Sequence, residues 1–341
     1  MKSILVTGGA GFIGSNYVRN KAKENITLVN LDALTYAGNL HNLEGMPSNH
    51  IFVEGNICDK KLIEGLFSTY DFDEVINFAA ESHVDRSITD PSIFVETNVS
   101  GTHNLLEICR RWWSEDPDNK NCKEYRKGAR YLQISTDEVY GTLGKEGKFK
   151  ETTPLAPNSP YSASKASADL FVRAYYRTFN FPCLITRCSN NYGPNQFPEK
   201  LIPLTIQNAL NGKKIPIYGN GLQIRDWIYV ADHCSAVDTV LSKGTIGEVY
   251  NIGCENEWAN IDIVRLILSE LSKDESLITY VEDRPGHDVR YAMDNHKIST
   301  ELGWRPKYKF EEGIKKTINW YLDNDGWLKD VISGHYRSFR L

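Results

Sequence analysis

The opening residues of the chain, MKSILVTGGAGFIG, constrain its fold more than any other stretch. A short apolar run leads directly into Gly8, Gly11 and Gly14, and a helix-like stretch follows from Phe12 onward. Glycines at this spacing between a strand and a helix let the backbone turn tightly and approach a pyrophosphate at the helix N-terminus. The segment predicts a dinucleotide-binding unit, although a glycine-rich turn without a ligand would share the pattern.

Strand-like and helix-like stretches then alternate through the first half of the chain. The apolar runs are ITLVNLD, HIFVEGNI, EVINFAA, RYLQIST and PCLITRCS. Uninterrupted apolar strands separated by helices predict a parallel sheet covered on both faces, which is an α/β, Rossmann-like doubly wound fold. After about residue 189, Pro, Gly and Asn become frequent, so we expect a smaller mixed α/β substrate-binding lobe.

This pattern divides the chain of 341 residues into two parts. We expect residues 1–188 to form the nucleotide-binding Rossmann domain, with residues 226–245 returning to it. Residues 189–225 and 246–341 should belong mainly to the substrate-binding lobe.

Composition excludes several classes of function. The net charge is -5, so the chain has no global basic field for nucleic acid or an anionic membrane. Its seven cysteines form no C-x-x-C pair, which disfavours a metal site or a disulfide framework and favours a reducing compartment. Because we see neither a signal peptide nor an apolar run of about 20 residues, we expect a cytoplasmic protein that does not enter a membrane.

Asp32 ends the second predicted strand, where a carboxylate would bind the ribose hydroxyls of an adenosine. The residues that follow, ALTYAGNLHN, contain no Arg or Lys to neutralise a 2′-phosphate. The sequence therefore predicts NAD rather than NADP. The alternative is that Asp32 only caps a turn.

Tyr161 and Lys165 in YSASK lie four residues apart, so they would share one face of a helix. We expect the nearby ammonium to lower the pKa of the Tyr161 phenol and make it a usable general base. A solvated helix face would show the same spacing by chance.

The stretch ISTDEVYG places two carboxylates, Asp137 and Glu138, after Thr136. Hydride transfer alone needs one base, whereas loss of water beside a newly formed ketone needs a base for the C–H and an acid for the leaving hydroxyl. The pair therefore predicts an elimination. Against it, strand alternation would send adjacent side chains to opposite faces unless the strand ends here, and a surface turn is the alternative.

These motifs together resemble the extended short-chain dehydrogenases/reductases, and more narrowly the dTDP-glucose 4,6-dehydratase family. The resemblance spans nearly the whole chain and rests on TGGAGFIGSN, NFAAESHVDRS, TNVSGT, STDEVYG, SPYSASKA, RCSNNYGPNQFPEKLIP, RDWIYVADH and EDRPGHDVRYA. It implies that Thr136, Tyr161 and Lys165 oxidise an alcohol. It also implies that Asp137 is the acid and Glu138 the base, an assignment that the residues alone leave open because adjacent carboxylates titrate together.

The resemblance also implies a set of cofactor-binding positions. Phe12 and Ile13 should lie against the pyrophosphate, and Asn56 and Ile57 should flank the adenine. This chain reads GNI where the family commonly reads GDI, but an amide can still contact adenine. The remaining positions near the cofactor are Ala79, Ala80, Ser82, Thr97 and Asn191.

For the substrate, dTDP-glucose, the resemblance implies sites mostly in the second half of the chain, and it implies a homodimer. The expected substrate-binding residues are His83, Thr136, Asn190, Lys200, Leu201, Arg225, Asn260, Arg284 and His287. Arg suits a diphosphate because its guanidinium donates two hydrogen bonds at once.

Three alternatives remain open at this level. One is a nucleotide-sugar 4-epimerase, which the acidic pair disfavours. Another is a 4,6-dehydratase acting on a different nucleotide sugar, since nothing in the composition selects thymine. The third is a non-catalytic NAD-binding regulator, which an intact YSASK disfavours.

The first testable prediction concerns cofactor choice. Because Asp32 would repel a 2′-phosphate, the purified protein should carry NAD or bind it far better than NADP, as measured by titration. Asp32→Ala should weaken NAD binding with little effect on the fold. Equal affinity of the wild type for both cofactors would contradict this argument.

Overall fold

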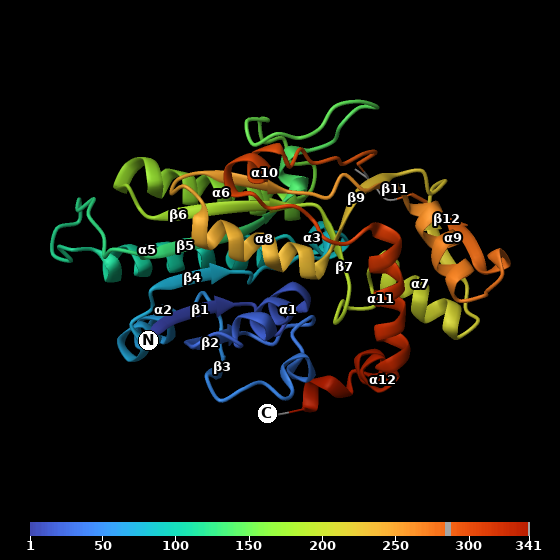
Figure 1. The fold of residues 1–341 in the computed structure, drawn as a ribbon, viewed down its shortest axis with the longest axis horizontal. Coiled ribbons are helices and arrows are strands. Elements are labelled where there is room, and N and C mark those ends of the chain that lie inside the picture. Colours follow the sequence, from blue (N-terminus) through green and yellow to red (C-terminus); the bar gives the residue numbers. More distant parts are fainter. Residues whose placement is uncertain (284–287, 340–341) are drawn as a thin grey trace.

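The computed structural model describes residues 1–283 and 288–339, and its centre is a parallel sheet of seven strands (Figure 1). The strands run in the order β10-β6-β5-β4-β1-β2-β3, and every neighbouring pair in this sheet is parallel. They are β1 (Lys2–Thr7), β2 (Ile26–Asp32), β3 (His50–Glu54), β4 (Glu74–Asn77), β5 (Arg130–Thr136), β6 (Cys183–Cys188) and β10 (Val249–Ile252). The predicted doubly wound fold is confirmed.

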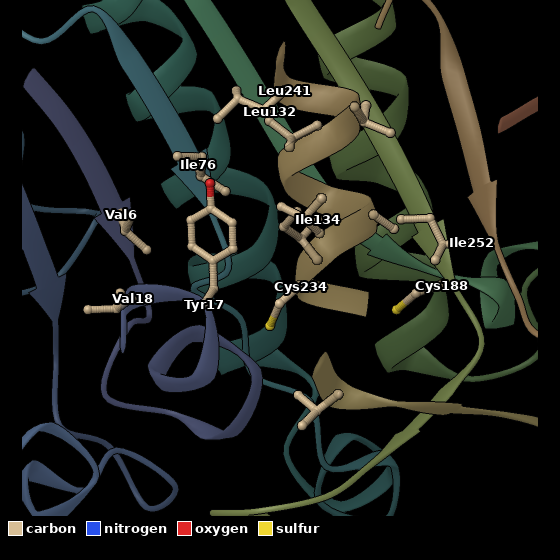
Figure 2. Packing of buried hydrophobic residues seen from close by; sticks show 14 of the residues in the cluster. Val6, Tyr17, Val18, Ile76, Leu132, Ile134, Cys188, Cys234, Leu241 and Ile252 are labelled. Carbon is tan, nitrogen blue, oxygen red and sulfur yellow. The ribbon is translucent and has the colours of Figure 1, made fainter. Parts of the chain in front are cut away.

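Helices cover both faces of this sheet. Over one face lie α1 (Phe12–Lys21), α8 (Val230–Lys243) and α10 (His296–Leu302), whose apolar side chains share a core with Val6, Ile76 and Leu132 (Figure 2). Over the other face lie α2 (Lys60–Tyr70), α5 (Thr102–Trp113) and α6 (Pro160–Phe179). The strands are apolar on both sides because both sides are covered.

The strand order reverses between β1 and β4. The chain runs outward from β1 through β2 to β3, and then crosses to the other side of β1 to begin β4. In open α/β sheets, ligands bind in the crevice outside the carboxyl ends of the strands at such a reversal. The glycine-rich turn after β1 lies at that point.

Helix α6, which carries Tyr161 and Lys165, begins and ends at clear local signals. The Ser159 hydroxyl accepts from the Ser162 N–H, and the Ser162 hydroxyl accepts from the Ser159 N–H, each at 3.0 Å, with Pro160 in the first turn. The helix ends at Asn180, whose φ of 56° is left-handed. These signals fix the start of the helix one residue before Tyr161.

A smaller lobe covers one end of the sheet (Figure 1). It holds two small sheets, one in the order β11-β9-β7 and the other pairing β12 with β8. Their strands are β7 (Asn190–Tyr192), β8 (Ile215–Tyr218), β9 (Ile224–Tyr229), β11 (Glu257–Ala259) and β12 (Ile278–Val281). The helices packed around them are α7 (Leu201–Leu210), α9 (Asn260–Glu270), α11 (Phe310–Asp323) and α12 (Asp325–Ser333).

Short helical segments complete the fold. They are α3 (Val84–Thr89) and α4 (Ser92–Phe94), a π-helical turn at Val95–Gly101, and 3₁₀ turns at Leu40–Leu43, Asp137–Tyr140, Glu275–Leu277 and His335–Ser338.

The expected division of the chain differs from this arrangement at two places. Residues 226–229 were expected to return to the nucleotide-binding domain but belong to β9 of the smaller lobe, whereas α8 does pack on the main sheet. Strand β10 and helix α10 fall within residues 246–341, yet β10 pairs with β6 in the main sheet and α10 packs beside it. Both Tyr250 and Ile252 are fully buried there. A four-residue strand is too short for its periodicity to show which sheet it joins.

None of the helices within residues 1–283 and 288–339 has the length and apolar character needed to span a membrane.

Candidate active site

One cavity of about 540 Å³ opens at the carboxyl ends of the main strands and extends between the sheet and the smaller lobe. All the predicted site residues within the described part of the chain line it. Arg284 and His287 lie outside the described residues. On the cofactor side the lining residues are Gly8, Gly11, Phe12, Ile13, Gly14, Asp32, Asn56, Ile57, Ala79, Ala80, Ser82, Thr97 and Asn191. The others are Thr136, Asp137, Glu138, Tyr161, Lys165, His83, Asn190, Lys200, Leu201, Arg225 and Asn260.

The glycine-rich turn has the shape of an anion cradle. Gly8 has a left-handed φ of 73°, and a Cβ at this position would lie 2.6 Å from the Ala79 nitrogen. A Cβ at Gly14 would lie 2.2 Å from the Gly8 carbonyl oxygen. Gly11 precedes α1 without a side-chain cap, so the first N–H groups of this helix are left for another acceptor. These residues fit the pyrophosphate of a dinucleotide.

Asp32 is buried beside this turn. Its Oδ2 accepts from the Ala10 N–H at 2.8 Å and its Oδ1 accepts from the Leu34 N–H at 2.9 Å. Burial raises the pKa of Asp32, while these backbone hydrogen bonds oppose the rise. The capping role and the cofactor role are therefore compatible, because each carboxylate oxygen keeps a second lone pair for a ribose hydroxyl.

Asn56 is already held by the backbone. Its Oδ1 accepts from the Cys58 N–H at 2.8 Å. The amide N–H₂ takes no part in this contact and is left to donate, so Asn56 would donate to a ring nitrogen of adenine where an aspartate would accept.

The two carboxylates come together because β5 ends at Thr136. The next four residues form a 3₁₀ turn, Asp137–Tyr140, and the Thr136 hydroxyl accepts from the Glu138 N–H at 3.3 Å. The same hydroxyl donates to Asp137 Oδ1 at 3.2 Å. Strand alternation therefore no longer applies to the pair, and both side chains line the cavity.

Asp137 lies in an environment that favours its protonated form. It is only 2% exposed, and its Oδ2 has no hydrogen-bond partner among the described residues. Burial, followed by the charge of Glu138, raises the pKa of Asp137 well above its usual range, and the Arg225 guanidinium opposes this rise. Two adjacent carboxyl groups with different exposure suit an acid and a base.

Lys165 is directed toward β5. Its Nζ donates to the Ile134 carbonyl oxygen at 2.7 Å, and burial lowers the pKa of this ammonium. Burial, followed by the charge of Glu138, raises the pKa of the Tyr161 phenol, and a hydrogen bond with Thr136 partly opposes the rise. The expected lowering of the Tyr161 pKa by Lys165 was wrong for the protein as it stands, because spacing alone did not show where the ammonium points.

Asn191, which was predicted to lie near the cofactor, is held by contacts with Ser189 and His233. Its Nδ2 donates to the Ser189 carbonyl oxygen at 3.0 Å, so its Oδ1 faces His233 Nδ1 at 2.9 Å. Burial lowers the pKa of His233 to about 3, so the ring stays neutral. The Asn191 amide is thereby held in one orientation.

Beside the predicted substrate-binding residues His83 and Lys200 lies a charged cluster that was predicted only in part. His83 Nε2 lies 3.3 Å and Lys200 Nζ lies 3.6 Å from the Glu199 carboxylate, which also accepts from the Tyr36 hydroxyl at 3.1 Å. Glu199 and Tyr36 both line the cavity and neither was predicted. The only feature of the sequence that could have indicated Glu199 was its position directly before Lys200.

Arg225 is buried and held by its own surroundings. Its guanidinium donates to the carbonyl oxygens of Ile224 and Asp288, each at 2.8 Å, and lies over the Tyr291 ring at 4.3 Å. Its charge acts on Asp137 and opposes the rise in the pKa of that carboxyl.

No group of three His, Cys, Asp or Glu side chains suited to a metal ion occurs within the described residues.

The chain is similar to known proteins over nearly its whole length. A family model described as GDP-mannose 4,6 dehydratase matches residues 5–317. A dTDP-glucose 4,6-dehydratase of Xanthomonas campestris pv. campestris (strain B100) is 54% identical over 352 aligned residues, which cover 100% of this chain and 99% of that one.

Two solved structures of similar proteins share the fold. The dTDP-glucose 4,6-dehydratase of Bacillus anthracis in complex with NAD is 49% identical, with a TM-score of 0.87 over 97% of this chain and 100% of that one. The dTDP-glucose 4,6-dehydratase of Streptomyces venezuelae with NAD and dTDP bound is 44% identical, with a TM-score of 0.88 over 96% and 99%.

The site yields a prediction for its tyrosine. Tyr161→Phe removes the hydroxyl that can take a proton but keeps the ring, so the variant should fold and bind dinucleotide normally. Alcohol oxidation should fall by about 10²–10⁴-fold, as measured from reduced dinucleotide absorbance. If turnover stayed close to that of the wild type, another residue would be the base.

Proposed function

The chain belongs to the dTDP-glucose 4,6-dehydratase family of extended short-chain dehydrogenases/reductases, and we propose that it converts dTDP-glucose to dTDP-4-keto-6-deoxyglucose with bound NAD. It is a hydro-lyase, and its product is a precursor in deoxysugar biosynthesis. One observation carries the proposal: a buried carboxyl and a second carboxylate share a short turn beside Tyr161, at the end of the strand that Lys165 contacts.

The first step is oxidation of the sugar at C4. Tyr161 takes the proton of the 4-hydroxyl, and Thr136 orients the phenol through their hydrogen bond. NAD, when bound, accepts the hydride from C4 and later returns it to C6. Its oxidised ring carries a positive charge, which favours the phenolate of Tyr161 and offsets the rise in pKa that burial and Glu138 cause. Gly11, Asp32 and Asn191 are the residues that would hold it.

The second step is elimination of water across C5 and C6. The C4 ketone acidifies the C5–H, and Glu138 removes that proton. Asp137, kept protonated by burial, gives its proton to the departing C6 hydroxyl, and a C5–C6 double bond forms. When hydride reaches C6, the proton on Glu138 returns to C5.

The balance closes without an external oxidant. The proton that Tyr161 took from the 4-hydroxyl replaces the proton that Asp137 gave to the leaving water, so both residues return to their starting states. The hydrogen lost as hydride from C4 is regained at C6, and one molecule of water leaves. NAD is therefore unchanged after each turnover and acts as a resident cofactor rather than a second substrate.

A nucleotide-sugar 4-epimerase would need only the oxidation and its reversal, and so would have no use for a buried acid beside the base. Incubation with a panel of nucleotide sugars, followed by mass spectrometry, separates the two reactions, because only a dehydratase releases a product lighter by one water. The same panel measures the preference for thymine.

We further propose that the protein works in the cytoplasm as a homodimer. Two large apolar side chains, Leu170 and Phe171, stand exposed on α6 and are 53% and 40% exposed. Burial of such a surface stabilises association. Light scattering should give the mass of two chains, whereas a single-chain mass at working concentration would contradict the dimer.

The test of the proposed function uses the acidic pair. Asp137→Asn with Glu138→Gln keeps shape but removes proton transfer, so dTDP-glucose should still produce enzyme-bound NADH, with hydride exchange at C4 and little or no keto-deoxy product. Absorbance and mass spectrometry measure the two steps. Normal product formation would make the pair structural, and loss of NADH formation in a folded, NAD-bound variant would place it in the oxidation step.

A further inference from the structure

The C-terminal segment, residues 325–339, lies against the nucleotide-binding domain although it is at the far end of the chain (Figure 1). Tyr336 is 3% exposed, and its hydroxyl donates a hydrogen bond to the carbonyl oxygen of Tyr36. The Phe339 ring stacks on His41 with centroids 3.8 Å apart. The Trp327 indole N–H donates to Asn42 Oδ1 at 2.8 Å. The segment thus contacts the stretch that follows β2 at several points.

The stretch it contacts forms one wall of the cofactor side of the cavity. Residues 33–38 directly follow Asp32, and Ala33, Thr35, Tyr36, Ala37 and Gly38 all line the cavity. Leu34 has a left-handed φ of 48°. A side chain in that conformation is disfavoured, so the loop needs contacts from outside to keep its shape.

Two of the contacts come from within the nucleotide-binding domain. The Leu34 N–H donates to Asp32 Oδ1 at 2.9 Å, and the Asn39 N–H donates to the Ala10 carbonyl oxygen at 3.0 Å. Between these anchors, the backbone carbonyl of Tyr36 is held by Tyr336. Tyr336 therefore supports the middle of the loop from outside the domain.

Packing against the side chain of Tyr36 also holds the loop in place. Phe197 lies edge-on to both Tyr36 and Tyr336, with centroid distances of 5.7 Å and 6.2 Å. The Arg86 guanidinium covers the Tyr36 ring at 4.5 Å. Three distant parts of the chain thus hold the loop, through the Phe197 and Tyr336 rings and the Arg86 guanidinium.

We propose that Tyr336 is a positioning residue for the cofactor: by holding the 33–38 loop beside Asp32, it slows the release of bound NAD. The inference rests on the proposed function, in which NAD is unchanged after each turnover and gains nothing by leaving. Tyr336 does not line the cavity, so it acts on the cofactor only through the loop.

The test compares two Tyr→Phe variants, each of which loses a hydrogen bond from a phenol to a backbone carbonyl. Tyr336→Phe removes the hydroxyl but keeps the ring on Phe197. Tyr125→Phe is the matched control, because its hydroxyl donates to the Phe179 carbonyl oxygen at 3.0 Å and does not lie at the cavity. Wild type and both variants are loaded with NAD, freed of unbound NAD and diluted into buffer without it. Bound NAD, conversion of dTDP-glucose and the melting temperature are then followed.

Tyr336→Phe should release NAD about 2- to 10-fold faster than wild type, in line with the loss of the hydrogen bond to the Tyr36 carbonyl. The bond that the hydroxyl accepts from Arg337 does not reach the loop. Its activity should decline after dilution and return to near the wild-type rate when NAD is added. Tyr125→Phe should keep NAD at the wild-type rate even if its melting temperature falls.

Equal NAD release from wild type and Tyr336→Phe would overturn the inference, and so would equally fast release from both variants, which would show a general loss of stability. A different result would contradict the proposed function. In that case the wild type itself would hold no NAD or would leave dTDP-glucose unconverted.

Discussion

The Lys165 ammonium donates a buried hydrogen bond of 2.7 Å to the carbonyl oxygen of Ile134, and the arrangement of the active site depends on this contact. It joins α6, which carries Tyr161, to β5 two residues before Thr136. A hydrogen bond from a charged donor contributes roughly 1.5–3 kcal/mol, and leaving that charge unpaired in the interior would cost more. The base for oxidation is therefore fixed relative to the turn that holds Asp137 and Glu138.

Within this fixed geometry, the carboxyl groups of Asp137 and Glu138 have different roles because they are buried to different extents. Asp137 is enclosed and its pKa is raised, so it can hold a proton to give away, whereas Glu138 is less buried. The negative charge of Glu138 also acts on Tyr161, so each proton transfer in the cavity alters the next. We infer that oxidation and elimination share one small site because the proton transfers of one step set the charges on Tyr161, Asp137 and Glu138 that the other step uses.

Much of this arrangement could be predicted from the sequence, because the motifs follow parallel strands whose carboxyl ends meet at one edge of the sheet. Periodicity could not place the four-residue strand β10, which was expected in the smaller lobe. Spacing put Tyr161 and Lys165 on one helix face but did not show where the ammonium points, so the direction of the Tyr161 pKa shift was wrong. Tyr36, Glu199 and Tyr336 were missed because their contacts join segments that are far apart in the sequence.

Hydride removed from C4 should return to C6 of the same sugar after water has left. dTDP-glucose carrying deuterium at C4 traces this transfer when the product is examined by NMR. We expect deuterium in the C6 methyl group of a 4-keto-6-deoxy product. Deuterium that remained at C4, or a product that kept its C6 hydroxyl, would contradict this expectation.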